Sequence, residues 1–144
     1  MIDKNRINSK IIFIKERLSA LSELAKLSES EFKADNRNIA SACYWLQTAV
    51  ESMIDVAQHI AVKKNLIRSK DVASVDFFEE LYNEGVISKE SLEKYRLMIR
   101  FRNRIVHLYQ EVSQDEVFKI ILDDLDDFKE FIKEIGEYVN IDDL

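Results

Sequence analysis

Apolar residues recur every three or four positions along almost the whole chain, and this spacing restricts the fold more than any other feature. The most regular set alternates steps of four and three, which is typical of helices that pack side by side in a bundle: Ile39, Cys43, Leu46, Val50, Met53, Ala57 and Ile60. The 144 residues include no proline and only two glycines, the residues that most often interrupt helices. The sequence therefore predicts an all-α fold, an up-and-down four-helix bundle with one additional short helix.

Capping signals divide the chain into these helices. We expect long helices at about residues 3–27 and 36–64, a short helix at 72–83 after a polar interval at 65–70, a long helix after Ser88, and a final long helix after Ser113 that runs to Val139. Ser28 with Glu31 and Ser113 with Glu116 have the spacing of a capping box, and Gly85 is suited to end a helix in the left-handed conformation. By its length, the chain is expected to form a single domain over residues 1–144.

Composition excludes several classes of protein. A hydrophobic content of 47% and a charged content of 33% are typical of a soluble globular protein, and a net charge of −6 disfavours indiscriminate binding of nucleic acid. No apolar run approaches the length of a membrane span, and the start of the chain lacks the pattern of a signal peptide. The single cysteine, Cys43, excludes an internal disulfide framework. These features predict a cytoplasmic protein without a membrane segment.

One basic segment stands out in this acidic chain. From Lys94 to Gln110 there are five lysines or arginines and no aspartate or glutamate. On a helix, the larger apolar stripe of this region is expected to face the core: Leu97, Phe101, Ile105, Leu108 and Val112. Ile99 and Val106 form a second apolar strip roughly opposite. Because a helix with two apolar sides is usually buried on both, we expect one side to face the bundle and the other a second copy of the chain.

Four side chains in the basic segment are suited to chemistry on a phosphodiester: Arg102, Asn103, His107 and Tyr109. A guanidinium binds a phosphate through two hydrogen bonds, and an imidazole titrates near neutral pH and exchanges a proton with a 2′-hydroxyl or leaving oxygen. Asn103 could orient the imidazole or donate to a phosphate oxygen, and Tyr109 could stack on a base. The set is suited to phosphoryl transfer on RNA, without a metal ion or other cofactor, and solvation of a basic helix end is the alternative interpretation.

The spacing of two of these residues sets a geometric condition. Arg102 and His107 are five residues apart, so on a straight helix their side chains point about 140° away from each other. For one substrate to contact both, the helix must break after Val106, or two copies of the chain must bring their segments together. The spacing therefore predicts a helix end or a dimer interface at this place.

The stretch R-N-R-I-V-H-L-Y, Arg102 to Tyr109, resembles the R-x4-H-x-Y motif of HEPN domains of the HepT type. The resemblance extends to the stretch Y-W-L-Q-T-A-V-E-S-M-I-D-V-A-Q-H-I within the second long helix and to the order of helices along nearly the whole chain. It implies a HEPN-like fold and a homodimer in which two copies of the motif line one cleft. It also implies a metal-independent endoribonuclease toxin that acts on tRNA or mRNA, with Arg102 and His107 catalytic and Asn103 and Tyr109 binding substrate.

The same resemblance implies a partner and a modification. HepT-like toxins are paired with a small MNT-type nucleotidyltransferase antitoxin, which can transfer AMP from ATP to the tyrosine of the motif, here Tyr109. A bulky anion at this position would block the cleft and repel an RNA phosphate. Two alternatives remain from the residues alone. One is a non-catalytic nucleotide- or partner-binding subunit of a nucleotidyltransferase complex, and the other is a helical dimerisation module without a ligand.

Three other features have competing interpretations. Glu51, Asp55 and His59 share one flank of the second long helix; a metal site is one reading, but an ion pair from Glu51 or Asp55 to an arginine of the motif helix is favoured. The acidic run at residues 123–127 is expected to be a solvated face. Tyr44 and Trp45 are expected to lie at an interface or in the core rather than to stack on bases.

Overall fold

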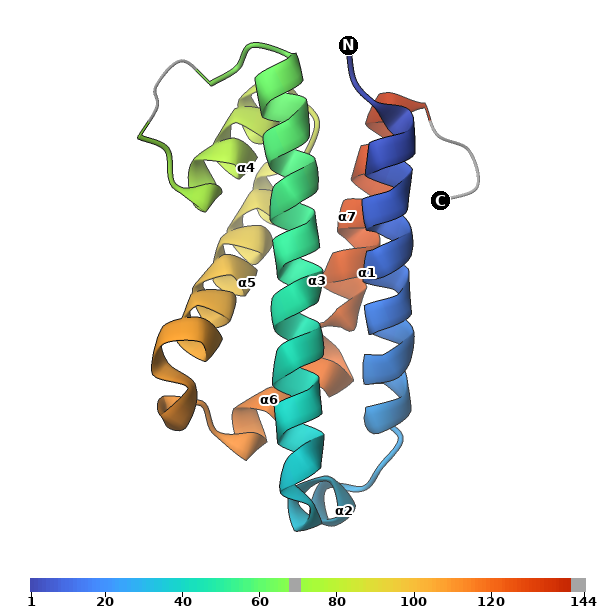
Figure 1. Ribbon diagram of the computed structural model, residues 1–144, viewed down its shortest axis with the longest axis vertical. Helices are drawn as coiled ribbons and strands as arrows, with labels where there is room; N and C mark the ends of the chain where they lie inside the picture. Colours follow the sequence, from blue (N-terminus) through green and yellow to red (C-terminus); the bar gives the residue numbers. More distant parts are fainter. Residues whose placement is uncertain (68–70, 141–144) are drawn as a thin grey trace.

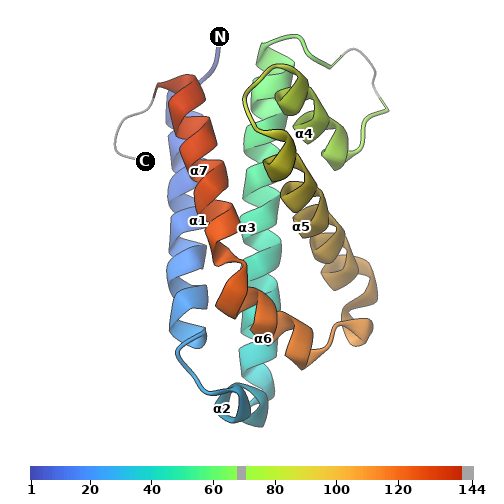
Figure 2. The same cartoon turned by 180° about the vertical axis from the view of Figure 1, so that it is seen from behind.

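The computed structural model describes residues 1–67 and 71–140, and every regular element within them is a helix. The elements are α1 (Lys4–Leu24), α2 (Glu29–Ala34), α3 (Asn36–Lys63), α4 (Ser74–Asn83), α5 (Lys89–Leu108), a 3-10 turn η1 (Tyr109–Glu111), α6 (Gln114–Asp123) and α7 (Leu125–Val139). In Figure 1, α3 lies between α1 and α5 and runs opposite to both, and Figure 2 shows α6 and α7 covering the other side of the bundle. The predicted all-α, up-and-down bundle is confirmed.

Polar side chains cap the helix starts, including the predicted Ser28, Ser88 and Ser113. Ser28 forms a reciprocal capping box with Glu31 at the start of α2, and Asp35 accepts a hydrogen bond from the Arg37 N–H at the start of α3. Ser88 and Ser113 cap α5 and α6. Gly85 has a φ of +84°, so it adopts the left-handed conformation predicted after α4. Of the predicted polar interval at 65–70, residues 68–70 lie outside the described residues.

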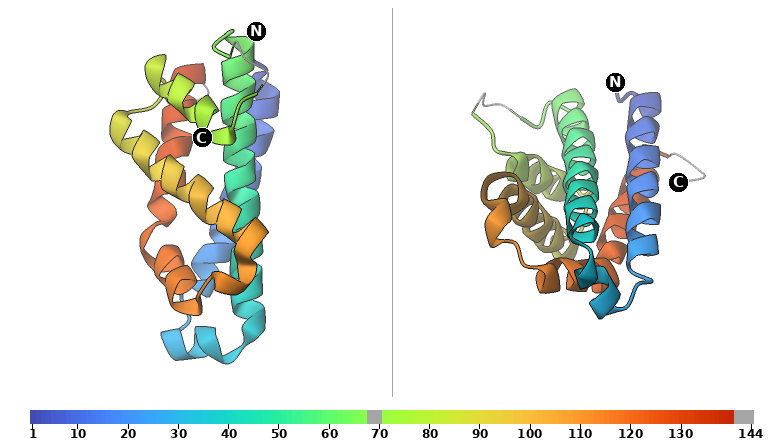
Figure 3. Two further views of the ribbon diagram at one scale, coloured as in Figure 1. Left: turned by 90° about the vertical axis from the view of Figure 1, so that its left-hand side faces the viewer. Right: turned by 60° about the horizontal axis from the view of Figure 1, so that its bottom comes forward.

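The prediction of one final long helix is wrong, because the helix breaks at Asp124. The backbone of this residue has φ −111° and ψ 2°, and it separates α6 from α7; the bend is visible in Figure 3. Aspartate is a poor residue for a helix interior, and Asp126 and Asp127 instead occupy the first turn of α7, where negative charge favours the helix N-terminus. The run is largely solvated, as predicted, except for the partly buried Asp127, whose carboxyl pKa is raised by burial.

An aromatic cluster fixes α5 on the bundle. The rings of Phe78, Tyr95 and Phe131 pack with centroids 5.4 to 6.0 Å apart and so join α4, α5 and α7. The Tyr95 hydroxyl donates to Glu134 of α7, and the other oxygen of that carboxylate accepts the Ser88 backbone N–H at 2.9 Å. The start of α5 is therefore fixed both by packing and by hydrogen bonds, which sets the direction in which its last two turns project.

The prediction of which face of α5 meets the core is only partly correct. The buried apolar side chains of this helix are Leu92, Tyr95, Ile99 and Ile105. Leu97 and Leu108, predicted in the core stripe, are 61% and 48% exposed, whereas Ile99, predicted on the opposite strip, is buried. The helix does carry two apolar sides. Its orientation is decided by the large Tyr95 and by Leu92 at its start, which the prediction from its middle residues left out.

Candidate functional site

The candidate site occupies the end of α5 and the turn that follows it. Arg102, Asn103 and His107 lie on α5 itself, and Tyr109 begins η1. The chain leaves the helical conformation at Leu108, with φ −136° and ψ 39°. The predicted helix end is found at this place, but it lies two residues after Val106, so both Arg102 and His107 remain on one continuous helix. Of the two alternatives, this leaves the one in which two copies of the chain bring their segments together. No described hydrogen bond joins these two side chains in a single protomer.

Arg102 is held by a carboxylate from the neighbouring helix. Its Nη2 and Nε donate to Oε2 of Glu51 on α3, at 2.6 and 3.2 Å. Both side chains are partly buried, and the same carboxylate oxygen lies 3.4 Å from Nε2 of Gln47, one turn earlier on α3. The expected ion pair between the polar flank of α3 and an arginine of the motif helix is confirmed, with Glu51 as the partner.

Asn103 contacts the same guanidinium rather than the imidazole. Its Oδ1 accepts a hydrogen bond of 3.0 Å from Nη1 of Arg102. Three of the five N–H groups of Arg102 are then used by described residues, and one remains on each terminal nitrogen. A guanidinium in this state can still bind two oxygens of a phosphate.

The other members of the polar flank of α3 are engaged elsewhere. Asp55 forms an ion pair with Lys10 of α1 at 2.9 Å, and the buried His59 accepts the Asp3 backbone N–H at 3.0 Å through Nε2. Burial lowers the pKa of His59, as do the nearby positive charges of Arg6 and Lys63. Among the described residues, no group of three or more histidine, cysteine, aspartate or glutamate side chains could hold a metal ion. The flank connects α3 to α1 and α5, so the metal interpretation gains no support.

His107 and Tyr109 are exposed on the surface of the protomer. The Tyr109 hydroxyl makes no hydrogen bond to any described residue, and its pKa is raised by partial burial of the ring and by the nearby Cys43. Cys43 itself is buried, and burial together with the charge of Glu116 raises its thiol pKa to about 11. Of the two aromatic residues at the start of α3, Trp45 packs partly on the core and Tyr44 is exposed.

A groove of about 710 Å³ runs beside the site, between α5 on one side and α3, α6 and α7 on the other. Apolar side chains line it, including Leu46, Met98 and Phe128.

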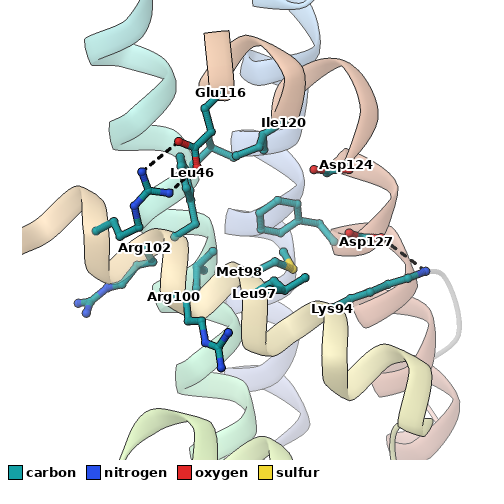
Figure 4. A pocket seen from close by; sticks show the side chains of 14 residues that line it. Leu46, Lys94, Leu97, Met98, Arg100, Arg102, Glu116, Ile120, Asp124 and Asp127 are labelled. Atoms are coloured by element: carbon teal, nitrogen blue, oxygen red, sulfur yellow. Dashed lines mark hydrogen bonds and ion pairs between the residues drawn. The ribbon is translucent and has the colours of Figure 1, made fainter. Parts of the chain in front are cut away.

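Two ion pairs lie at the ends of this groove. Nη1 and Nη2 of Arg104 donate to the two carboxylate oxygens of Glu116 at 2.5 and 3.0 Å. Nζ of Lys94 lies 3.8 Å from Oδ1 of Asp127. Figure 4 shows Lys94 facing Asp127, and Arg100 pointing away from both. Arg102 lines this groove, whereas His107 does not.

Comparison with known proteins finds the same family over most of the chain. Residues 14–135 match the family model described as "Ribonuclease HepT-like". The mRNA nuclease HepT of Shewanella oneidensis is 33% identical over 103 residues, which are 72% of this chain and 76% of that protein. The tRNA nuclease HepT of Aphanizomenon flos-aquae is 27% identical over 94 residues, 65% of this chain and 63% of that protein.

A solved complex gives the same result for the fold. The tri-AMPylated HEPN toxin of Shewanella oneidensis, in complex with its MNT antitoxin, superposes with a TM-score of 0.84 and 31% identity. The match covers 95% of this chain and 99% of the toxin. The superposition therefore includes both α3 and α5, the two helices that form the candidate site.

Proposed function

We propose, because this chain belongs to the HepT-like ribonuclease family, that it is a cytoplasmic toxin that cleaves mRNA or tRNA and is neutralised by an MNT-type nucleotidyltransferase. The relatives named above supply the substrate classes and the partner. The observation that carries the proposal is the end of α5. There, a guanidinium fixed by Glu51 and Asn103 lies one to two turns from an exposed imidazole and an exposed phenol.

The reaction uses the side chains of the motif and no metal. Arg102 binds the non-bridging oxygens of the scissile phosphate with the N–H groups that Glu51 and Asn103 leave unused. The 2′-oxygen attacks the phosphorus as its proton is removed, and the bond to the 5′-oxygen breaks as that oxygen is protonated. His107 gives or takes one of these protons. The products carry a 2′,3′-cyclic phosphate and a free 5′-hydroxyl.

A second copy of the chain completes the site. Arg102 and His107 diverge by about 140° on the continuous helix, so one phosphate meets both only where two protomers face each other. The end of α5 carries two exposed apolar side chains that a homodimer would cover, Val106 and Leu108. In such a dimer, Arg102 of one protomer and His107 of its partner act on the same phosphodiester.

Tyr109 is the proposed site of modification by the antitoxin. The Shewanella toxin is AMPylated in its complex, and Tyr109, the last residue of the motif, is 44% exposed. Attack of this oxygen on the α-phosphorus of ATP forms a phosphodiester to AMP and releases pyrophosphate. The attached anion then occupies the place of an RNA phosphate and repels it.

The test is cleavage of purified mRNA and tRNA in EDTA by the chain prepared without its partner. Wild-type protein and the Lys119→Ala control, which removes an exposed charge on α6, should produce cyclic-phosphate ends at equal rates. His107→Ala should reduce the rate by about 10²- to 10⁴-fold, the usual contribution of a general acid or base. Equal cleavage by wild type and His107→Ala would refute the proposed mechanism.

A further inference from the structure

We propose that Glu51 on α3 is a positioning residue of the ribonuclease site, which orients the guanidinium of Arg102 toward the RNA phosphate. This inference rests on the proposed function. It extends the site beyond the motif to a second helix that lies about 50 residues earlier in the chain.

The contacts fix the guanidinium from two sides. Oε2 of Glu51 accepts from Nη2 and Nε of Arg102 at 2.6 and 3.2 Å, and Oδ1 of Asn103 accepts from Nη1 at 3.0 Å. The plane and the direction of the guanidinium are thereby defined before any substrate is bound. The unused N–H groups, one on each terminal nitrogen, are the pair that binds two phosphate oxygens.

The carboxylate is itself held in place. Nε2 of Gln47 lies 3.4 Å from the oxygen that Arg102 uses, and Glu51 stands in the interior of the long helix α3. A rigid helix therefore supports the carboxylate, and the carboxylate supports the arginine. Such support is what a site needs, because an arginine on an exposed helix face otherwise samples many rotamers.

A neighbouring ion pair offers a control that distinguishes a positioning role of Glu51 from a purely structural role. Asp55, one turn after Glu51 on the same flank of α3, pairs with Lys10 of α1 at 2.9 Å. The side chains are 36% and 43% exposed in the Lys10–Asp55 pair, and 25% and 35% in the Arg102–Glu51 pair. Both pairs join α3 to an adjacent helix, but only Glu51 contacts the motif. Asp55 is therefore the matched control.

The effect on the kinetics follows from charge and geometry. Glu51 offsets part of the positive charge of Arg102, so its removal does not weaken the attraction for RNA. What is lost is the fixed direction of the N–H groups in the transition state. We expect kcat to fall while KM stays unchanged or decreases, in contrast to the rise in KM that loss of a simple RNA-binding residue produces.

The experiment measures kcat and KM for RNA cleavage with Glu51→Gln, Glu51→Asp and Asp55→Asn, together with the unfolding midpoint of each variant. Glu51→Gln removes the charge at constant shape, and Glu51→Asp withdraws the oxygen while keeping the charge. Both should lower kcat by about 10- to 100-fold, the range expected when a reacting group is misplaced by up to an ångström. Asp55→Asn should leave kcat within about twofold of wild type while costing similar stability.

A double-variant cycle identifies the residue through which Glu51 acts. Glu51→Gln combined with Arg102→Ala should cleave no more slowly than Arg102→Ala alone, because the arginine it would position is absent. A wild-type kcat for both Glu51 variants, an equal loss in Asp55→Asn, or losses that add to that of Arg102→Ala would each overturn the inference. None of those results would contradict the proposed function. The proposed function fails separately, if His107→Ala cleaves RNA as fast as wild type does.

Discussion

Replacing Leu108 with aspartate should separate the proposed homodimer. Leu108 is 48% exposed at the end of α5, and full burial of a leucine contributes about 1.5–3 kcal/mol, so completing its burial contributes about 1 kcal/mol per protomer. A symmetric interface uses the residue twice, which gives about 2 kcal/mol. An unpaired carboxylate buried in its place adds at least a similar cost. Together these effects of about 4 kcal/mol raise the dimer Kd by roughly 10³-fold.

A matched control is available on the other side of α3. Ile12 on α1 is also 48% exposed, and Figure 1 shows α1 separated from α5 by α3. Sedimentation equilibrium should show Leu108→Asp as a monomer at micromolar concentrations, at which wild type and Ile12→Asp are dimers. RNA cleavage by Leu108→Asp should fall with dimer content and recover as protein concentration rises. An unchanged Kd for Leu108→Asp, or dissociation of Ile12→Asp instead, would refute this placement of the interface.

Three further outcomes are expected. When Tyr109→Phe is co-expressed with an MNT-type nucleotidyltransferase, its intact mass should show no added AMP, and the protein should cleave RNA. The control Tyr44→Phe, which keeps Tyr109, should gain AMP. Addition of AMP to Tyr109→Phe would contradict the assignment of Tyr109 as the modified residue. Burial holds the pKa of His59 below its ordinary value of 6.5, so below pH 6.5 the unfolded chain binds more protons and the stabilisation by His59 falls. In urea titrations, the stability difference between wild type and His59→Gln should therefore shrink from pH 7 to pH 5; a constant difference would contradict it. Cys43, with a thiol pKa of about 11, should resist iodoacetamide at pH 8 until the chain is unfolded, and rapid alkylation of the native protein would show that the thiol is accessible.

The sequence predicted the helices where local signals were unambiguous. Side-chain caps act within a few residues, so Ser28, Ser88 and Ser113 located helix starts correctly. The break at Asp124 escaped prediction because the apolar spacing continues across it, and only the run of aspartates hinted at an interruption. The rotation of α5 was also misjudged, since a helix with two apolar sides leaves open which one meets the core, and the packing of Tyr95 decides it.

The candidate site was predictable to a similar extent. The spacing of Arg102, His107 and Tyr109 identified the family, and the polar flank of α3 suggested an ion pair to the motif helix. Which carboxylate makes that pair depends on how far α5 slides along α3, and the structure selects Glu51 over Asp55. The contact of Asn103 with Arg102 depends on a side-chain rotamer. Spacing alone had left open whether Asn103 orients the imidazole or donates to a phosphate oxygen.

Mixing two inactive variants tests whether two protomers share the catalytic site. Arg102→Ala and His107→Ala each lack one group, but a mixed dimer of the two retains one site with Arg102 from one protomer and His107 from its partner. Random exchange makes half of the dimers mixed, each with one of two sites intact, so about one quarter of wild-type RNA cleavage should return. If mixed dimers form, as two affinity tags would show, and cleavage stays at the level of the separate variants, the site is not shared between protomers and the account is wrong.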